Sequence, residues 1–372
     1  MKVAIVAESF LPRINGVTNS VCRVLDHLAA RGHDAIVVAP APGPDSYAGF
    51  PVRLVPGAAL PFYRSFVVGM PGRRVEDALR DFAPDVVHLA SPLVLGSSGG
   101  AAARRLGIPA VAVFQTDIAG FARRYGFRGT DRVIWSWLRH VHEQAERTLV
   151  PSMPTLRELE RWGLPRLELW ARGVDQDRFD PRHRSAALRA EWAPGGEVLI
   201  GYVGRLAAEK SPRLLARLAD LPGTRLVVVG DGPEEQRLRR LLPGAVFTGL
   251  QTGARLSQIM ASLDVFVHTG ANETFCQAVQ EALSAGVPVV APAAGGPLDL
   301  VRPGDNGLLF TPGDGGALRA AVATLASDQP LRLRMGLAAR RSVRGRTWQT
   351  ICDELIGHYE EAAFGAVARR AA

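Results

Sequence analysis

The chain has 372 residues, of which 47% are hydrophobic and 22% charged, a composition typical of a folded protein and a length that favours two domains. Its three cysteines lack metal-ligand spacing, which argues against a disulfide scaffold and a zinc site, and its apolar runs are too short to span a bilayer. The net charge of +8 suits phosphate-bearing ligands or an anionic membrane surface, and by itself also nucleic acid.

Apolar runs of strand length alternate with amphipathic segments through the first half of the chain. Because Glu8 interrupts the first apolar run, we interpret that run as a strand rather than a signal peptide, and we expect a cytoplasmic protein. The segment from Asn19 to Arg31 has the apolar spacing of a helix, and Gly32 is a typical stop. Runs apolar enough for burial on both faces occupy residues 2–9, 35–41, 85–91, 109–117 and 147–152. This pattern predicts parallel strands covered by helices.

The alternation breaks at residues 172–181, which are polar and turn-rich and which we interpret as a hinge, and residues 182–196 are charged and loop-like. It then restarts, and further strands are expected at 197–204, 225–232, 245–250, 264–270 and 287–293. The sequence therefore predicts an α/β protein with two Rossmann-like, doubly wound parallel-sheet domains, 1–175 and 176–346, facing a cleft. A last helix within 347–372, from about Thr347 to Ala363, could pack back on the first domain.

Two glutamates lie eight residues apart around the expected start of a helix that follows the strand at 264–270. Glu273 is in the loop, and Glu281 is about two turns into a helix that we expect to open at Thr274. The first N–H groups of a helix carry roughly half a positive charge and bind phosphate readily. A diphosphate there would leave one carboxylate near hydroxyls on each side, which is the layout of a nucleotide sugar. The alternative is an ordinary helix-start acid and a solvated glutamate.

A second candidate loop begins where a predicted strand ends in Gly204, and it carries Arg205 and Lys210. Both cations would lie at the carboxyl end of the strand, where they can neutralise a diphosphate leaving group without a metal. Lys2 is the only other lysine of this arginine-rich chain, so the lysine at 210 suggests that a compact ammonium is needed there. An ordinary charged surface loop is the alternative.

Three further loops are weaker candidates. The turn from Gly230 to Gly232 lacks the last glycine of a dinucleotide fingerprint and fits a tight turn better. In the long loop at 10–18, Gly16 would let the backbone approach a ligand closely. Gln115 and Asp117 end a buried strand and could bind sugar or acceptor hydroxyls; for this stretch and for the loop at 10–18, simple loop and cap chemistry is the alternative.

Taken together, these motifs resemble the retaining glycosyltransferases of family 4, which have the GT-B fold. Glu273 and Glu281 match the E-x7-E element of the family. Its phosphate loop, its glycine loop and two further motifs match GRLAAEKS at 204–211, FLPRINGV at 10–17, AGGPLDLV at 294–301 and NGLLF at 306–310. The resemblance covers essentially the whole chain. Within the family, FLPRINGVTNSV and FQTDIAGFARRYG resemble actinobacterial GDP-mannose-dependent α-mannosyltransferases that act on glycolipids.

The resemblance implies a nucleotide-diphospho-sugar donor, with GDP-mannose favoured, and neither a metal nor another cofactor. Arg205 and Lys210, beside Gly204, would hold the diphosphate and act in catalysis. The other implied contacts are the transferred sugar at Glu273, the ribose at Glu281, the nearby N–H groups of Phe275 and Cys276, the diphosphate at Gly16, a sugar hydroxyl at Asp117, and the base near Leu250.

The sequence departs from the family pattern at two positions. Many members have His where this chain has Gln115, and many have Glu where this chain has Asp299. Without a histidine at 115 to act as acid or base, the resemblance favours a front-face mechanism, in which a phosphate oxygen of the donor takes the acceptor proton.

One stretch bears on the acceptor. Arginines interleaved with aromatic residues between Phe121 and Arg139 suit peripheral docking on an anionic bilayer, although a buried amphipathic helix after a basic loop is the alternative. The leading hypothesis is transfer of α-mannose from GDP-mannose to a lipid-linked acceptor at the cytoplasmic membrane face. The alternative enzyme uses a UDP-sugar with a glycolipid or a soluble natural-product acceptor.

Two other classes of protein fit less well. A nucleic-acid-binding module is suggested by the basic charge, but we find no reading helix, stacking motif or basic tail and expect no nucleic-acid partner. A phosphorylase of the same broad fold normally needs a lysine for pyridoxal phosphate, and the one candidate, Lys210, is better explained by phosphate contact.

Overall fold

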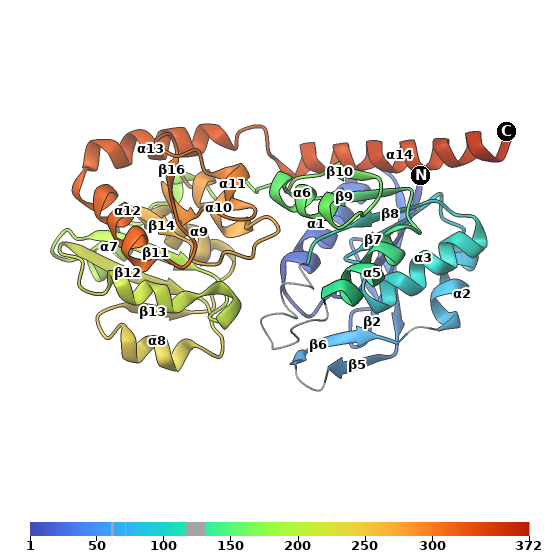
Figure 1. Cartoon of the computed structure of the whole chain (residues 1–372), viewed down its shortest axis with the longest axis horizontal. Helices are drawn as coiled ribbons and strands as arrows, with labels where there is room; N and C mark the ends of the chain where they lie inside the picture. The colour runs from blue at the N-terminus through green and yellow to red at the C-terminus, as the bar shows by residue number, and fades with distance from the viewer. Residues whose placement is uncertain (61–62, 71, 117–130, 372) are drawn as a thin grey trace. The chain divides into compact units, whose positions relative to one another are not determined.

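The computed structural model describes residues 1–60, 63–70, 72–116 and 131–371, and they form two compact units. The first unit combines residues Met1–Arg172 with Trp348–Ala372, and the second is Gly173–Thr347 (Figure 1). The sequence placed the first boundary at 175 and the start of the last segment at 347. Each unit is an α/β layer structure built on its own parallel sheet.

The first unit contains an eight-stranded sheet in the order β10-β9-β8-β7-β1-β2-β4-β3. Every pair of neighbours is parallel except β3 and β4. The main strands are β1 (Lys2–Ala7), β2 (Asp34–Pro40), β4 (Phe50–Val55), β7 (Val86–Ala90), β8 (Ala110–Val113), β9 (Arg147–Val150) and β10 (Leu167–Leu169). The short β3 (Ser46–Tyr47) and a separate antiparallel hairpin of β5 (Gly57–Leu60) and β6 (Tyr63–Gly69) were not predicted.

Helices cover both faces of this sheet, as a buried parallel sheet requires. The helices are α1 (Gly16–Ala30), α2 (Arg73–Phe82), α3 (Val94–Leu106), α5 (Asp131–His142), α6 (Met153–Arg161) and α14 (Trp348–Ala371). One core cluster joins α1 and α14 to the sheet, and another joins α2 and α3 to it. The last helix, α14, contacts α1, β7 and β8, and its buried Tyr359 lies 2.5 Å from the Nδ1 atom of His88.

The second unit contains a six-stranded, wholly parallel sheet in the order β13-β12-β11-β14-β15-β16. Its strands are β11 (Val198–Val203), β12 (Thr224–Val229), β13 (Val246–Gly249), β14 (Val265–Val267), β15 (Val289–Pro292) and β16 (Gly307–Phe310). Its helices are η1 (Pro181–His183), α7 (Ala186–Trp192), η2 (Ala208–Lys210), η3 (Pro212–Leu218), α8 (Glu235–Leu241), α9 (Gly253–Ser262), α10 (Gln277–Ser284), α11 (Pro297–Leu300), α12 (Gly315–Ser327) and α13 (Gln329–Ser342).

Two local predictions for the second unit are wrong. Residues 182–196, expected as loop, contain α7, because Ser185 caps the helix and Leu188 and Trp192 bury one face of it. The helix expected to open at Thr274 begins instead at Gln277. The reason is Cys276, which adopts a left-handed conformation with φ of 81° and holds the preceding residues out of the helix.

Candidate active site

The candidate site of the second unit lies where its strand order reverses. β11 has β12 on one side and β14 on the other, so the loops that follow β11 and β14 leave neighbouring strands at the same edge of the sheet. This topological switch point is where open parallel sheets bind ligands. The two motifs singled out in the sequence, around Lys210 and Glu273, are these two loops.

Three charged or polar side chains meet at this point. The ammonium of Lys210 donates to the Oε1 atom of Glu273 at 2.6 Å, and the Nε2 atom of His268 lies 3.0 Å from the same oxygen. The side chains of Glu273 and His268 are only 11% and 5% exposed, whereas that of Lys210 is 30% exposed. The structure therefore brings together the two residues selected from distant motifs, and it adds a histidine that sequence reasoning missed.

Backbone contacts fix the loops that carry these side chains. The hydroxyl of Thr269 donates to the carbonyl of Lys210 at 2.7 Å, which joins the two loops directly. The buried hydroxyl of Tyr202, on β11, donates to the carbonyl of Arg205 at 3.1 Å. Arg205 itself is 41% exposed, and its guanidinium lies 3.8 Å from Glu209. The ammonium and the carboxylate thus rest on a fixed framework, while the arginine stays partly open to solvent.

The mutual interactions of this cluster control its ionisation. Burial opposes the charged form of Glu273, but the Lys210 ammonium and the His268 imidazole outweigh burial and lower the pKa of the carboxyl to about 2. Burial also opposes protonation of His268, but Cys276 and Glu273 raise the pKa of the imidazole above its usual value. At neutral pH the carboxylate of Glu273 then lies between two cationic side chains, and the partly exposed ammonium of Lys210 suits an anionic ligand.

Glycines let neighbouring loops support the cluster at close range. Gly230 has φ of 128°, and a Cβ atom there would lie 2.1 Å from the carbonyl oxygen of Gly204. A Cβ atom on Gly296 would lie 1.9 Å from the carbonyl oxygen of Phe275, and the N–H of Gly296 donates to the carbonyl of Glu273 at 2.8 Å. The Gly230 loop is therefore the tight turn favoured by the sequence, and the AGGP motif packs directly against the loop that carries Glu273.

The other predicted contacts of the second unit lie around this cluster. Phe275 and Cys276 are buried, at 5% and 6% exposure, in the loop before α10. Glu281 is half-buried within α10. Leu250 is 65% exposed and follows the edge strand β13, two strands away from β11. Phe275, Cys276 and Glu281 thus belong to the loop and helix that follow β14 at the switch point. Leu250 lies along the same carboxyl edge of the sheet.

A metal at this cluster needs separate consideration. His268, Glu273 and Cys276 each offer a ligand atom, and these atoms lie within 4.8 Å of one another. However, the Glu273 oxygen that would serve already lies at hydrogen-bond distance from Lys210 and His268. A divalent cation would have to displace an ammonium and deprotonate an imidazole, and both changes cost free energy. The donor set of this cluster therefore fits a metal poorly.

In the first unit, the predicted residues are only partly placed. Gly16 is the first residue of α1, is exposed, and has no atom within 4 Å of the position of a Cβ atom. Asn15 caps the helix by accepting from the N–H of Thr18 at 3.0 Å. Gln115 is half-buried after β8, and Asp117 lies outside the described residues. The backbone around Gly16 is thus open to a ligand, and the role expected of Asp117 stays a prediction.

The structure contradicts part of the membrane-docking prediction for residues 121–139. Its residues up to 130 lie outside the described ranges, but Trp135, on α5, is 2% exposed. The Trp135 ring stacks on Trp162 with 5.0 Å between centroids, so it belongs to the core and is not available to a bilayer. Arg132 and Arg139 are exposed. No helix of the described residues combines the length and apolarity needed to cross a membrane.

Glu8 is a second residue that sequence reasoning missed as a site feature. It follows β1, is 3% exposed, and accepts from the N–H groups of Leu95 and Gly96 at the start of α3. Its other carboxyl oxygen is buried and has no hydrogen-bond partner among the described residues. Burial raises the pKa of Glu8 to about 7, although these N–H groups act in the opposite direction.

This carboxyl should make stability depend on pH. The folded-state pKa of Glu8 is about 7, above the usual value of 4.5. The contribution of this carboxyl to the free energy of unfolding is therefore full below pH 4.5 and is lost as the pH rises to 7. The full change is about 3 kcal/mol by the conversion of pKa shifts to free energy. We expect the melting temperature of Glu8→Gln, relative to that of the wild type, to increase as the pH rises from 5 to 8. Calorimetry on both proteins measures this difference. A difference in melting temperature that stays the same from pH 5 to pH 8 would contradict the raised pKa of Glu8.

Comparison with known proteins agrees with this architecture. The family model for glycosyltransferase family 4 matches residues 14–178, and the model for glycosyl transferases group 1 matches residues 185–342. The solved structure of the Anabaena protein HepE in complex with UDP superposes with a TM-score of 0.79 at 19% identity, covering 97% of this chain and 100% of that one. Two family models that match consecutive parts of the chain, together with the shared fold, define the protein as a glycosyltransferase with the GT-B fold, as the sequence predicted.

Curated relatives narrow the class. A GDP-mannose-dependent α-mannosyltransferase of Mycobacterium tuberculosis is 52% identical over 97% of this chain and 96% of its own length. A GDP-mannose-dependent α-mannosyltransferase of Corynebacterium glutamicum is 47% identical over 97% of this chain and 89% of its own length. The chain belongs to glycosyltransferase family 4, in the group that contains these α-mannosyltransferases, which confirms the resemblance stated from the motifs.

Proposed function

We propose that this glycosyltransferase transfers mannose from GDP-mannose, with retention of the α configuration, to a lipid-linked acceptor at the inner face of the membrane. The donor and the reaction are those named for its full-length relatives at 47% and 52% identity. The observation that carries the proposal is the Lys210–Glu273 pair at the switch point, at 2.6 Å, because it combines a cation for phosphate with a carboxylate for sugar hydroxyls.

The donor would be divided among the loops of the second unit. Lys210, with Arg205 beside Gly204, would face the diphosphate, and the N–H groups of Phe275 and Cys276 would lie near the transferred sugar. Glu273 would accept hydrogen bonds from the hydroxyls of that sugar, since a carboxylate held below its usual pKa is an acceptor at every physiological pH. Glu281 would bind the ribose, and main-chain groups near Leu250 would recognise the base.

In this proposal, the reaction occurs on one face of the sugar. The bond from the anomeric carbon to the phosphate oxygen breaks, and the acceptor oxygen forms its bond to that carbon on the same face. The acceptor proton passes to the departing phosphate oxygen, so no side chain has to act as base. The protein contributes charge: Lys210, supported by the protonated His268, stabilises the negative charge that develops on the diphosphate.

The direct test is transfer from radiolabelled GDP-mannose by the full chain, with a panel of diacylglycerol glycolipids in anionic vesicles as acceptors. Mannolipid formation supports the proposal. Transfer from UDP-glucose instead would keep the glycosyltransferase assignment and replace the donor. Donor hydrolysis or binding with no transfer to any lipid, together with transfer to a soluble acceptor, would refute the lipid acceptor.

We further expect turnover without a metal. In buffers containing an excess of EDTA, the initial rate should equal that in MgCl₂ or MnCl₂, because the cations of Lys210 and His268 already balance the leaving group. The measurement is the initial rate of mannose transfer in the three buffers at saturating donor. A loss of activity in EDTA that MgCl₂ restores would show that the donor diphosphate is held by a metal instead.

A further inference from the structure

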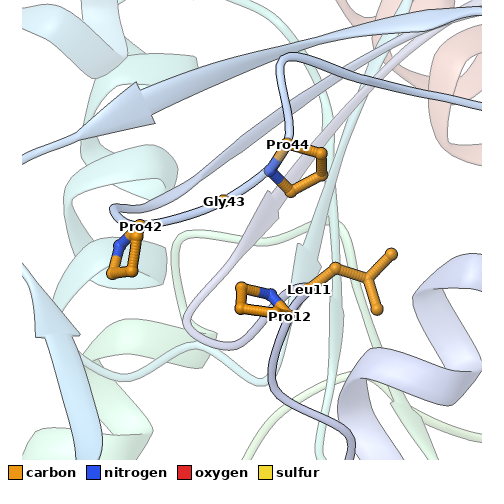
Figure 2. A pocket seen from close by; sticks show the side chains of 5 residues that line it. All are labelled: Leu11, Pro12, Pro42, Gly43 and Pro44. Atoms are coloured by element: carbon orange, nitrogen blue, oxygen red, sulfur yellow. The ribbon is translucent and has the colours of Figure 1, made fainter.

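A hollow lies in the first unit, beside the loop at 10–18 that contains Gly16. It has a volume of about 520 Å³ and lies between the loop that follows β1 and the loop that follows β2. Leu11 and Pro12 come from the first loop, and Pro42, Gly43 and Pro44 from the second (Figure 2). Because β1 and β2 are adjacent parallel strands, the hollow is at the carboxyl edge of the sheet, where ligands of such folds bind.

The lining of this hollow, which we call the proline pocket, is apolar. Figure 2 shows the rings of Pro12, Pro42 and Pro44 arranged around the opening. None of its five lining residues carries a charged or hydrogen-bonding side chain, and the prolines lack an N–H group. Its volume is within the range of roughly 300–1,000 Å³ that is usual for small-molecule sites. The pocket therefore suits a hydrocarbon and offers little to a sugar or a phosphate.

The walls of the proline pocket are held in place by close packing. Leu11 packs against the core cluster that joins α1 to the sheet. A Cβ atom on Gly43 would lie 3.0 Å from the Cδ2 atom of Leu54 and 3.1 Å from the carbonyl oxygen of Leu11, so the two loops already touch at this glycine. The proline rings restrict the remaining backbone freedom. A site formed in advance loses little entropy when an apolar chain enters it.

The surroundings of the pocket indicate an amphiphile rather than a peptide. Arg13 follows Pro12 and takes part in no ion pair among the described residues, and the exposed Ile14, at 67%, follows it. Three residues separate Pro12 from Gly16, the open start of α1. A peptide would need partners for its backbone N–H and C=O groups, which this lining does not supply. An alkyl chain in the pocket would leave its polar head beside Arg13.

We propose that the proline pocket binds an alkyl chain of the lipid acceptor, close to its polar head. This inference rests on the lipid acceptor of the proposed function, and it assigns the part of the chain that holds the lipid. Chain binding contributes affinity in proportion to the apolar surface removed from water. It also places the hydroxyl-bearing head of the acceptor near the start of α1.

The test uses the full chain and a C10 alcohol that carries a diazirine, with n-decanol as competitor. Photolabelled protein is digested, and the labelled peptides are identified by mass spectrometry. We expect saturable labelling of peptides that contain 9–15 or 41–47, suppressed by n-decanol. Pro44→Asp, which puts a charge on the pocket wall, should lower this labelling about tenfold or more, since a charge in an apolar site is strongly unfavourable.

Ala48→Asp is the control, because it adds the same charge four residues further along the chain, in the turn between β3 and β4, at an exposed position with φ of 50°, which Asp tolerates. It should label like the wild type. If Pro44→Asp does not fold, Pro44→Ser replaces it, with an expected loss of about threefold from the lost ring surface. Labelling that is spread over the surface, is not suppressed by n-decanol, or is equal in the pocket variant and the control would overturn the proposal.

A thermal-shift measurement with GDP-mannose on the same samples separates this inference from the proposed function. If GDP-mannose raises the melting temperature but the proline pocket is not labelled, the alkyl-chain site is wrong and the proposed function stands. Labelling of the pocket without a donor shift contradicts mannosyl transfer from GDP-mannose and leaves the alkyl site standing.

Discussion

Lys210→Ala is expected to lower the turnover number by about two to three decades, the usual result of removing a group that stabilises charge on a leaving group. The ammonium lies 2.6 Å from Glu273 at the switch point and is the more exposed member of the pair, so it can reach a ligand. Its loss also leaves a buried carboxylate with one partner fewer. The measurement is kcat for mannose transfer at saturating GDP-mannose.

Lys2→Ala is the matched control, because Lys2 is the only other lysine in the chain. Its ammonium donates to the carbonyl of Phe82 in the first unit and lies 4.5 Å from the Phe82 ring, so its removal should leave kcat within about twofold. Lys210→Arg is also informative, since a guanidinium keeps the charge but not the compact geometry. If a folded Lys210→Ala enzyme turned over at the wild-type rate, the leaving-group role would be wrong.

Glu273→Gln should lower kcat by about two decades while the affinity for GDP changes by less than about threefold, because the sugar contacts are lost and those to the nucleotide remain. The amide also removes the negative charge between Lys210 and His268, so those two cations then repel each other without a counter-charge. The two measurements are kcat for transfer and the Kd of GDP by calorimetry.

Glu281→Gln is the counterpart of this experiment. If Glu281 binds the ribose, the substitution should weaken GDP binding by about tenfold or more, in line with the loss of a hydrogen bond to a charged group. Equal losses of GDP affinity in the two variants would show that the roles of the two glutamates have been assigned wrongly. The comparison is matched, since both changes replace a carboxylate by an amide in or beside α10.

The positions of the strands were predictable because buried parallel strands leave continuous apolar runs in the sequence. The expected strands at 197–204 and 245–250 contain β11 and β13, and the expected strand at 225–232 overlaps β12, which begins one residue earlier. Lys210 and Glu273 were also predictable, each from its own loop. A lysine in an arginine-rich chain and a carboxylate before a helix are signals that need no partner to be visible.

The residues that sequence reasoning missed are those whose meaning depends on a neighbour far along the chain. His268 directly follows β14 and has no local pattern around it, and its importance comes from the 3.0 Å contact with Glu273. Glu8 interrupts an apolar run, and only the fold shows that it caps the start of α3, at residues 95 and 96. A titratable residue at the carboxyl end of a predicted strand was the one available signal for both.

The sequence by itself determined that this protein has two parallel α/β units, that it belongs among retaining glycosyltransferases, and which two loops carry the charged residues Lys210 and Glu273. Local periodicity and short motifs indicate these properties, and both depend on neighbours only a few residues away. The tertiary structure decided that Lys210, His268 and Glu273 form one cluster, that Trp135 belongs to the core, and that five apolar residues from two loops line one open hollow. Strand order and side-chain burial set these contacts, and neither is encoded by local pattern.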